Sequence, residues 1–319
     1  MARILLAVLA LLLGPLAAVA QQRTVTVTFD DLPYQASDGE LCDPEVAMTL
    51  TRDFVAMLRP LNTRGVAFVN EGKGCEARRA DLLPPILAVW LDAGLELGNH
   101  TFSHPSLNAF PVTVWLAEVD QGAEITRPLL AARGQTLRWF RHPYLHTGET
   151  MEKKRAAAEG LALRGYTVAP VTLNNDDWMF AALYRSAEAD GDTALKTRIG
   201  EAYVDYMAQV LDHWEPYSAE LTGGREPAQI LLLHANTLNR DWYPRIHALF
   251  LSRGYRFIPL EETLRDPVYA LSDAYIRNNG VSWLHRWTAG QGRPIRWEPE
   301  PPQWIRQAYA ALGQGNLSR

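Results

Sequence analysis

The sequence has only two cysteines, Cys42 and Cys75, among 319 residues. They are too far apart to form a CxxC metal or redox motif, which excludes that class of site. If the chain is exported to an oxidising compartment, such a pair can close. We therefore predict a disulfide between them. Two free thiols are the alternative, because sequence spacing cannot give the Cα separation that a bridge requires.

An excess of positive charge is also absent. The 31 Lys and Arg residues are outnumbered by 36 Asp and Glu residues, which gives a formal net charge of −5. Nucleic acids and anionic membranes attract basic surfaces, so neither is expected as a partner. Composition does not predict the oligomeric state.

Long hydrophobic runs are missing everywhere except at the N-terminus. There, Arg3 is followed by an apolar run from Ile4 to Leu13 and by small residues that end at Ala20. This pattern is typical of a secretory signal peptide over residues 1–20. An uncleaved membrane anchor is the alternative, although the run is shorter than the roughly 20 residues that span a bilayer. We expect export, to the periplasm or out of the cell, with no stable membrane anchor after cleavage.

Strand-like and helix-like segments alternate between residue 23 and about residue 265. β-Branched or apolar runs predict seven strands, and helical periodicity predicts the segments between them. Alternation of this kind predicts an α/β fold with a parallel sheet, either a barrel or a doubly wound sheet. The predicted strands are 23–29, 65–69, 95–98, 137–140, 166–169, 229–233 and 255–258, and the predicted helices are 44–58, 81–93, 112–132, 149–164, a helical stretch within 180–213, and 242–252.

The last part of the chain breaks this alternation. Residues 267–319 contain four of the ten tryptophans and a proline-rich stretch. We predict a barrel domain over residues 21–266 and a Trp-rich C-terminal extension, 267–319, packed on it. Trp283 and Trp287 are four residues apart, which favours burial in a core. A sugar-stacking platform is the alternative.

Polar clusters follow four of the predicted strands. They are Asp30-Asp31, His100-Thr-Phe-Ser-His104, Arg141-His-Pro-Tyr144 and His234. In barrels and doubly wound sheets, catalytic groups gather beyond the carboxyl ends of the strands. The four clusters are thus expected to form one site.

The histidine pair and the aspartate pair together predict a metal centre. His100 and His104 are four residues apart, so on a helical turn both imidazoles could bind one ion. A carboxylate as third ligand leaves a coordination position for water. One aspartate can then bind the ion while its neighbour takes a proton from the water. Alone, the spacing of the histidines is a weak signal, and two adjacent aspartates at a strand end are more often a helix cap or a solvated turn.

These motifs resemble the NodB-homology polysaccharide deacetylases, carbohydrate esterase family 4. Five motifs appear in the family's order between residues 24 and 260. The resemblance implies a distorted (β/α)7 barrel, one divalent metal ion with zinc as the default, and an acetylated carbohydrate as substrate. It implies Asp31, His100 and His104 as metal ligands and Asp30 as general base.

The remaining motifs imply the other roles. Arg141 would orient the base, and the Tyr144 backbone N–H would help to hold the oxyanion. Asp177 and Trp178 would form a wall of the acyl pocket, Leu232 would contact the acetyl methyl group, and His234 would be the general acid. The alternative for Arg141 is a surface ion pair. The alternative for both His234 and Trp178 is a place in the core.

Six positions depart from the family pattern, and none of them removes a metal ligand, the base or the acid. They are Leu32, His142, Leu145, Asn174, Ala235 and Asn236. We interpret His142 and His146 as residues that shape the loop, and a position in the site is the alternative. The sequence therefore predicts a metal-dependent hydrolase that removes N- or O-acetyl groups from a carbohydrate, most simply an N-acetylhexosamine of a cell-wall polymer or exopolysaccharide. Amide hydrolysis on a small non-sugar substrate and an inactive carbohydrate-binding relative are the alternatives.

Overall fold

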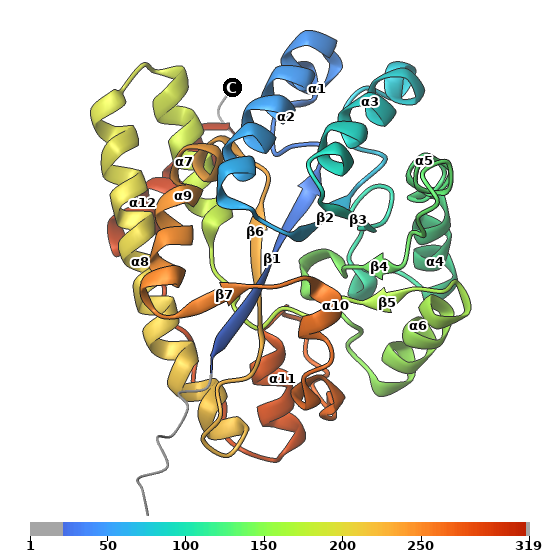
Figure 1. Ribbon diagram of the computed structural model, residues 1–319, viewed down its shortest axis with the longest axis vertical. Helices are drawn as coiled ribbons and strands as arrows, with labels where there is room; N and C mark the ends of the chain where they lie inside the picture. Colours follow the sequence, from blue (N-terminus) through green and yellow to red (C-terminus); the bar gives the residue numbers. More distant parts are fainter. Residues whose placement is uncertain (1–21, 317–319) are drawn as a thin grey trace, which may run out of the picture.

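A computed structural model describes residues 22–316, and it contains one parallel sheet of seven strands. The order is β5-β4-β3-β2-β1-β6, and β7 pairs with the first residues of β1. Figure 1 shows β1 in the middle of the molecule with helices around it. The strands are β1 (Arg23–Leu32), β2 (Gly65–Val69), β3 (Glu96–Asn99), β4 (Trp139–Phe140), β5 (Thr167–Val168), β6 (Gln229–His234) and β7 (Tyr255–Phe257).

The central strand is buried on both faces, as expected of a parallel sheet that helices cover. Val25, Val27 and Phe29 point into one layer of the core, and Thr26 and Thr28 are equally buried on the other face. The two threonine hydroxyls donate to the carbonyls of Ile258 and Leu231. Beyond β5 the chain returns to β6 through one parallel bridge between Leu173 and Leu231. The predicted distorted (β/α)7 barrel is thus confirmed.

Helices cover the outside of the curled sheet (Figure 1). Most begin and end within a few residues of the prediction. The helices before the extension are α1 (Asp38–Cys42), α2 (Pro44–Leu58), α3 (Arg79–Asp92), α4 (Val112–Gln121), α5 (Thr126–Ala131), α6 (Met151–Leu163), α7 (Asp177–Ala189), α8 (Thr193–Leu221), α9 (Thr237–Ser252) and α10 (Leu260–Thr263).

One predicted helix, 112–132, is two helices in the structure. Gly122 ends α4 at a point where a Cβ would overlap the backbone of Thr101 and Phe102. The buried Glu71 carboxylate then accepts hydrogen bonds from the N–H groups of Ile125 and Thr126, which starts α5. Both causes lie far away in the sequence, so local periodicity did not reveal them.

The C-terminal extension packs directly on the barrel. Helix α11 (Trp283–Gly290) is anchored by the Trp283 N–H, which donates to the Val171 carbonyl. Trp283 and Trp287 are buried, so the predicted core position is correct and a stacking platform is excluded. Helix α12 (Gln303–Asn316) packs against α7, where the Tyr309 ring meets the edge of Trp178 at 5.1 Å between centroids.

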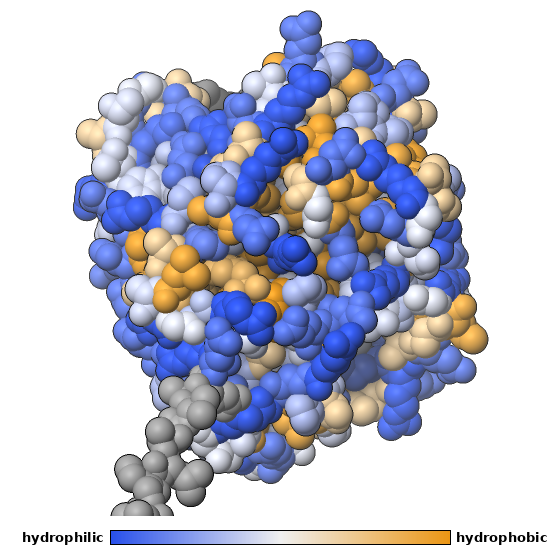
Figure 2. Space-filling model, in the orientation of Figure 1, coloured by the Kyte–Doolittle hydropathy of each residue, from blue (hydrophilic) through white to orange (hydrophobic). Residues whose placement is uncertain are grey.

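The N-terminal segment, the surface and the two cysteines were each the subject of a prediction. The predicted signal peptide, residues 1–20, lies outside the described residues. Within 22–316 no helix is long and apolar enough to cross a bilayer. The face in Figure 2 is mostly hydrophilic, with hydrophobic patches between the helices. Cys42 and Cys75 are free thiols rather than the predicted disulfide. They lie side by side, and hydrogen bonding with Cys75 raises the pKa of the Cys42 thiol to about 11.

Candidate metal centre and catalytic pocket

Four strand ends meet around one pocket of about 460 Å³. They are the carboxyl ends of β1, β3, β4 and β6, which carry the four polar clusters. Parallel strands place their carboxyl ends at one edge of the sheet, and this brings together side chains as distant in sequence as Asp30 and His234. The predicted site residues that line the pocket are Asp30, Asp31, His100, His104, Tyr144, Trp178, Leu232 and His234.

The three predicted ligands have the spacing of a metal site. The Asp31 Oδ1 atom lies 3.7 Å from His100 Nε2 and 3.5 Å from His104 Nε2. Ligand atoms about 2 Å from a shared zinc ion would be separated by about 3.3 Å in a tetrahedron. Asp31 Oδ1 is buried without a hydrogen-bond partner. A buried carboxylate oxygen facing two imidazole nitrogens fits a divalent cation.

The protonation of the histidines suits the same role. His100 Nδ1 lies 2.8 Å from the Arg141 carbonyl, to which it donates, so Nε2 keeps its lone pair for an ion. Burial lowers the pKa of His100 well below the ordinary value and also lowers the pKa of His104. Both imidazoles are therefore neutral at neutral pH, as metal ligands must be.

Asp30, the predicted base, is buried beside Arg141. Burial raises the pKa of Asp30 to about 6, although the Arg141 guanidinium opposes this rise. The guanidinium is fully buried, with Nη1 3.6 Å from Asp30 Oδ2 and Nη2 2.9 Å from the Thr28 hydroxyl. A surface ion pair is thereby excluded for Arg141. Its contacts hold the Asp30 carboxylate toward the pocket.

His234 is held by Asp177. The Asp177 carboxylate accepts from the backbone N–H of His234 at 2.8 Å and lies 2.7 Å from Nδ1 of its ring. Burial disfavours the imidazolium, but Asp177 outweighs this effect, so the pKa of His234 is raised to about 9. The ring is therefore a proton donor at neutral pH, with Nε2 on the side away from Asp177.

The prediction that Asp177 forms a wall of the acyl pocket is wrong. Asp177 is fully buried behind His234 and accepts a further hydrogen bond from the Asn239 amide. The neighbouring Asp176 lines the pocket instead. An aspartate at a helix start can point either way, and only the position of β6 decides that it meets His234.

Trp178 and Leu232 lie where a substrate wall was predicted. Leu232 lines the pocket, and Trp178 is 38% exposed, which excludes a plain core position for it. Trp178 also borders a second pocket of about 710 Å³, which shares Asp31 and Gln35 with the first. The catalytic pocket therefore adjoins a second cavity, which is lined in part by residues of α7 and α12.

The loop after β4 has an unusual backbone. Tyr144 and Leu145 are both left-handed, with φ of 56° and 55°. Within the described residues, the Tyr144 N–H has no backbone acceptor outside its own helical turn. His142 stacks on Trp115 at 5.3 Å and also borders the pocket, whereas His146 contacts Ser106 through Nδ1. The interpretation as a loop residue holds for His146, and His142 is in addition part of the pocket wall.

Two residues beside Asp31 were missed by the sequence analysis. Lys73 Nζ lies 3.4 Å from Asp31 Oδ2, and Gln35 donates to the same oxygen at 3.1 Å. Asn236, at one of the departures from the family pattern, donates to Gln35 in turn. Although burial opposes it, Lys73 and the nearby histidines lower the pKa of Asp31 below its usual range. No local pattern marks Lys73 or Gln35 as part of a site.

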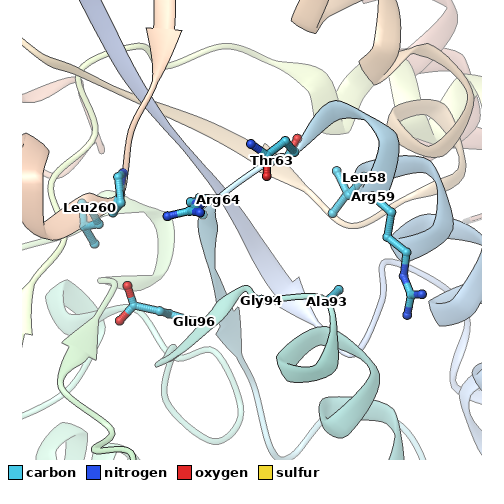
Figure 3. Close-up of a pocket in the computed structure, with 11 residues that line it drawn as sticks. Leu58, Arg59, Thr63, Arg64, Ala93, Gly94, Glu96 and Leu260 are labelled. Atoms are coloured by element: carbon cyan, nitrogen blue, oxygen red, sulfur yellow. The ribbon is translucent and has the colours of Figure 1, made fainter.

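A different pocket lies at the opposite end of the sheet. It measures about 410 Å³ and is bordered by residues at the starts of β2 and β3, including Gly65 and Glu96 (Figure 3). Arg59, Arg64 and Glu96 provide its charges, and no histidine lines it. The predicted catalytic residues are absent from it.

This fold and site define a class of protein: an α/β barrel with an Asp-His-His cluster at the carboxyl ends of its strands. The family model described as polysaccharide deacetylase matches residues 18–164, and this segment belongs to that family. The resemblance carried by the motifs is thereby confirmed. The match ends before α7, so Asp177 and His234 lie beyond it.

Several solved structures are similar to this one, and the one with a TM-score of 0.50 shares its fold. The chitin deacetylase of the fungal pathogen Colletotrichum lindemuthianum is 21% identical, with a TM-score of 0.50 over 77% of this chain and 89% of that one. A family 4 carbohydrate esterase from Streptomyces lividans, in complex with acetate, is 18% identical, with a TM-score of 0.47 and coverage of 82% and 97%. A mutant family 4 pseudoenzyme from Bacillus anthracis with restored activity is 16% identical, with a TM-score of 0.49 and coverage of 76% and 68%. No curated protein sequence matches significantly.

Proposed function

We propose that this protein is a metal-dependent deacetylase that hydrolyses N- or O-acetyl groups of a carbohydrate. The observation that carries the proposal is the placement of the Asp31, His100 and His104 cluster between Asp30 and His234 in one pocket. A divalent ion held by these ligands would lower the pKa of a bound water and polarise an acyl carbonyl.

The protein's own residues would move the protons. Asp30, buried and kept in place by Arg141, accepts the proton of the attacking water. The Tyr144 N–H donates to the oxyanion that develops on the acyl oxygen. His234, kept protonated by Asp177, then donates its Nε2 proton to the departing amine or alcohol. The two groups titrate on opposite sides of neutral pH, as a base and an acid must.

The shape of the pocket favours a sugar over a small amide. Trp178 presents a partly exposed indole ring beside polar side chains, and aromatic faces pack well on sugar rings. The adjoining 710 Å³ cavity leaves room for further sugar units. An N-acetylhexosamine within a polymer is the substrate that we propose, with zinc as the default ion.

The test is acetate release from a panel of acetylated glycans by the zinc-loaded protein and its Asp30→Asn variant. We expect release from at least one N-acetylhexosamine oligomer and a loss of about 10²-fold or more in the variant, since general base catalysis contributes 10²–10⁴-fold. Absence of release from every glycan, with one ion bound per chain, would refute the proposal. A variant at full rate would show that Asp30 is not the base.

We also propose that the chain is exported and that Cys42 and Cys75 pair after export. The adjacent thiols support a bond that needs little movement. Protein recovered from an oxidising compartment should resist alkylation until it is reduced. Two thiols that react before reduction would contradict the pairing.

A further inference from the structure

The C-terminal extension reaches the loop that carries Tyr144. Arg286, on α11, is 1% exposed. Its Nη2 donates to the Leu145 carbonyl at 2.5 Å, and its Nη1 donates to the Thr147 hydroxyl at 2.8 Å. A buried arginine from the extension thus donates hydrogen bonds to the residue after Tyr144 and to Thr147 of the same loop.

Other groups keep this arginine in place. Asp273 Oδ2 lies 3.5 Å from Nη1 and supplies the opposite charge. The guanidinium also lies over the Trp283 ring, 4.6 Å from its centroid, and Nε donates to the Val281 carbonyl. Asp273 in turn binds Lys154 at 2.6 Å. This ion pair connects the extension to α6, the barrel helix that follows the loop in sequence.

A second contact comes from Gly280, which lines the catalytic pocket. A Cβ at this position would overlap the Tyr144 carbonyl oxygen and crowd the Leu145 side chain. The backbone of the extension therefore lies directly against Tyr144, and only glycine leaves room for this approach.

The backbone conformation of the loop that carries Tyr144 is unfavourable without such contacts. A left-handed conformation costs a non-glycine residue roughly 1–2 kcal/mol, and the loop has two in succession. Conformations of this kind persist only where their surroundings hold them. We propose that Arg286 is a positioning residue that, with Gly280, holds Tyr144 in the conformation that turns its N–H into the catalytic pocket. This inference rests on the proposed hydrolysis, in which that N–H stabilises the oxyanion.

The test uses Arg286→Gln, Arg286→Lys and Gly280→Ala, with Arg296→Gln as matched control. Arg296 belongs to the same extension but is more than half exposed and pairs with Glu220. Removing one oxyanion donor costs about 10²–10³-fold in kcat. We expect Arg286→Gln and Gly280→Ala to lower kcat by at least about tenfold with KM nearly unchanged. Arg286→Lys should recover part of the loss, and the control should match the wild type.

A binding measurement separates positioning from general stability. Methylphosphonate is a tetrahedral anion and acetate a planar one, and calorimetry on the zinc-loaded proteins gives both affinities. We expect the two disruptive variants to weaken methylphosphonate at least about tenfold and acetate far less, because an oxyanion hole fits the tetrahedral form. Zinc affinity should not change.

Each contrary result has its own meaning. If folded Arg286→Gln keeps the wild-type kcat and methylphosphonate affinity, Arg286 does not position Tyr144. Failure of the wild type to bind methylphosphonate also overturns the inference, because no oxyanion site would then exist to be positioned. If the wild type binds methylphosphonate more tightly than the variants but releases no acetate from any glycan, the proposed function fails while the positioning stands.

Discussion

Asp30 and Asp31 are neighbours in sequence, yet their surroundings give them opposite properties. Burial dominates at Asp30 and raises its pKa to about 6, whereas Lys73 and the histidines keep the pKa of Asp31 low. Asp31 has a left-handed backbone, with φ of 68°, and its carboxylate meets Lys73, whereas the Asp30 carboxylate meets Arg141. One is thereby suited to accept a proton and the other to remain an anionic ligand.

The ligand assignment makes a prediction for single histidines. His104→Ala should weaken zinc binding at least about 100-fold, since even groups behind the ligands contribute 10–100-fold. His146→Ala is the control, because His146 contacts Ser106 and the Tyr144 ring but not Asp31. Competition with a chromophoric chelator measures both affinities. Equal loss in the two variants would contradict the assignment.

Asp177 makes a prediction for the pH profile. A general acid must be protonated, so kcat should fall on the alkaline side as pH rises through the His234 pKa of about 9. The Asp177→Asn variant lacks the carboxylate charge that raises the pKa of His234. Burial, which lowers this pKa, is still present in the variant. The alkaline limb should therefore move by at least about one unit toward lower pH. An unmoved limb would mean that another group is the acid.

At the scale of elements, the strands were predictable and their surroundings were not. β1, β2 and β6 are apolar or β-branched runs buried on both faces, so composition locates their ends within three residues. The strand ends then place the four polar clusters together. In contrast, the break between α4 and α5 depends on Glu71, and the support of Asp31 depends on Lys73. Such contacts join distant segments and leave no local pattern.

The start of α5 allows a stability test. Glu71→Ala would leave the N–H groups of Ile125 and Thr126 without their acceptor. Each unsatisfied buried donor costs about 1–3 kcal/mol, so we expect a loss of about 2–4 kcal/mol in unfolding free energy by urea titration. Glu124→Ala, at an exposed position next to the same turn, should change it by less than about 0.5 kcal/mol. A similar, small effect of both would show that Glu71 is not needed for α5.

At the scale of the whole molecule, barrel and extension together bound the substrate region. Trp178 of the barrel and Tyr309 of the extension pack edge to face beside the 710 Å³ cavity, which adjoins the catalytic pocket. α11 lies behind the Tyr144 loop, and α12 borders this cavity. The extension therefore contributes to the site from two directions, although none of the five motifs lies in it.

Because Trp178 lines both the catalytic pocket and the adjoining cavity, we predict that its effect on KM depends on glycan length. Trp178→Ala should raise KM for a tetrameric N-acetylhexosamine about tenfold or more, since stacking and burial of an aromatic face contribute on the order of 1–3 kcal/mol. KM for the monomer should change much less, and kcat should be nearly constant. Trp297→Ala, at another exposed tryptophan of the extension outside both pockets, is the control. An equal effect on monomer and tetramer would place the glycan elsewhere.

We propose that deacetylation by this protein requires one ion, bound by Asp31, His100 and His104. The most direct test is to titrate zinc into chelator-treated protein and to follow acetate release from an N-acetylhexosamine oligomer. We expect no release without metal, a linear rise with added zinc, and a plateau at one ion per chain. Release that persists in the metal-free protein, or that does not respond to zinc up to one ion per chain, would contradict it.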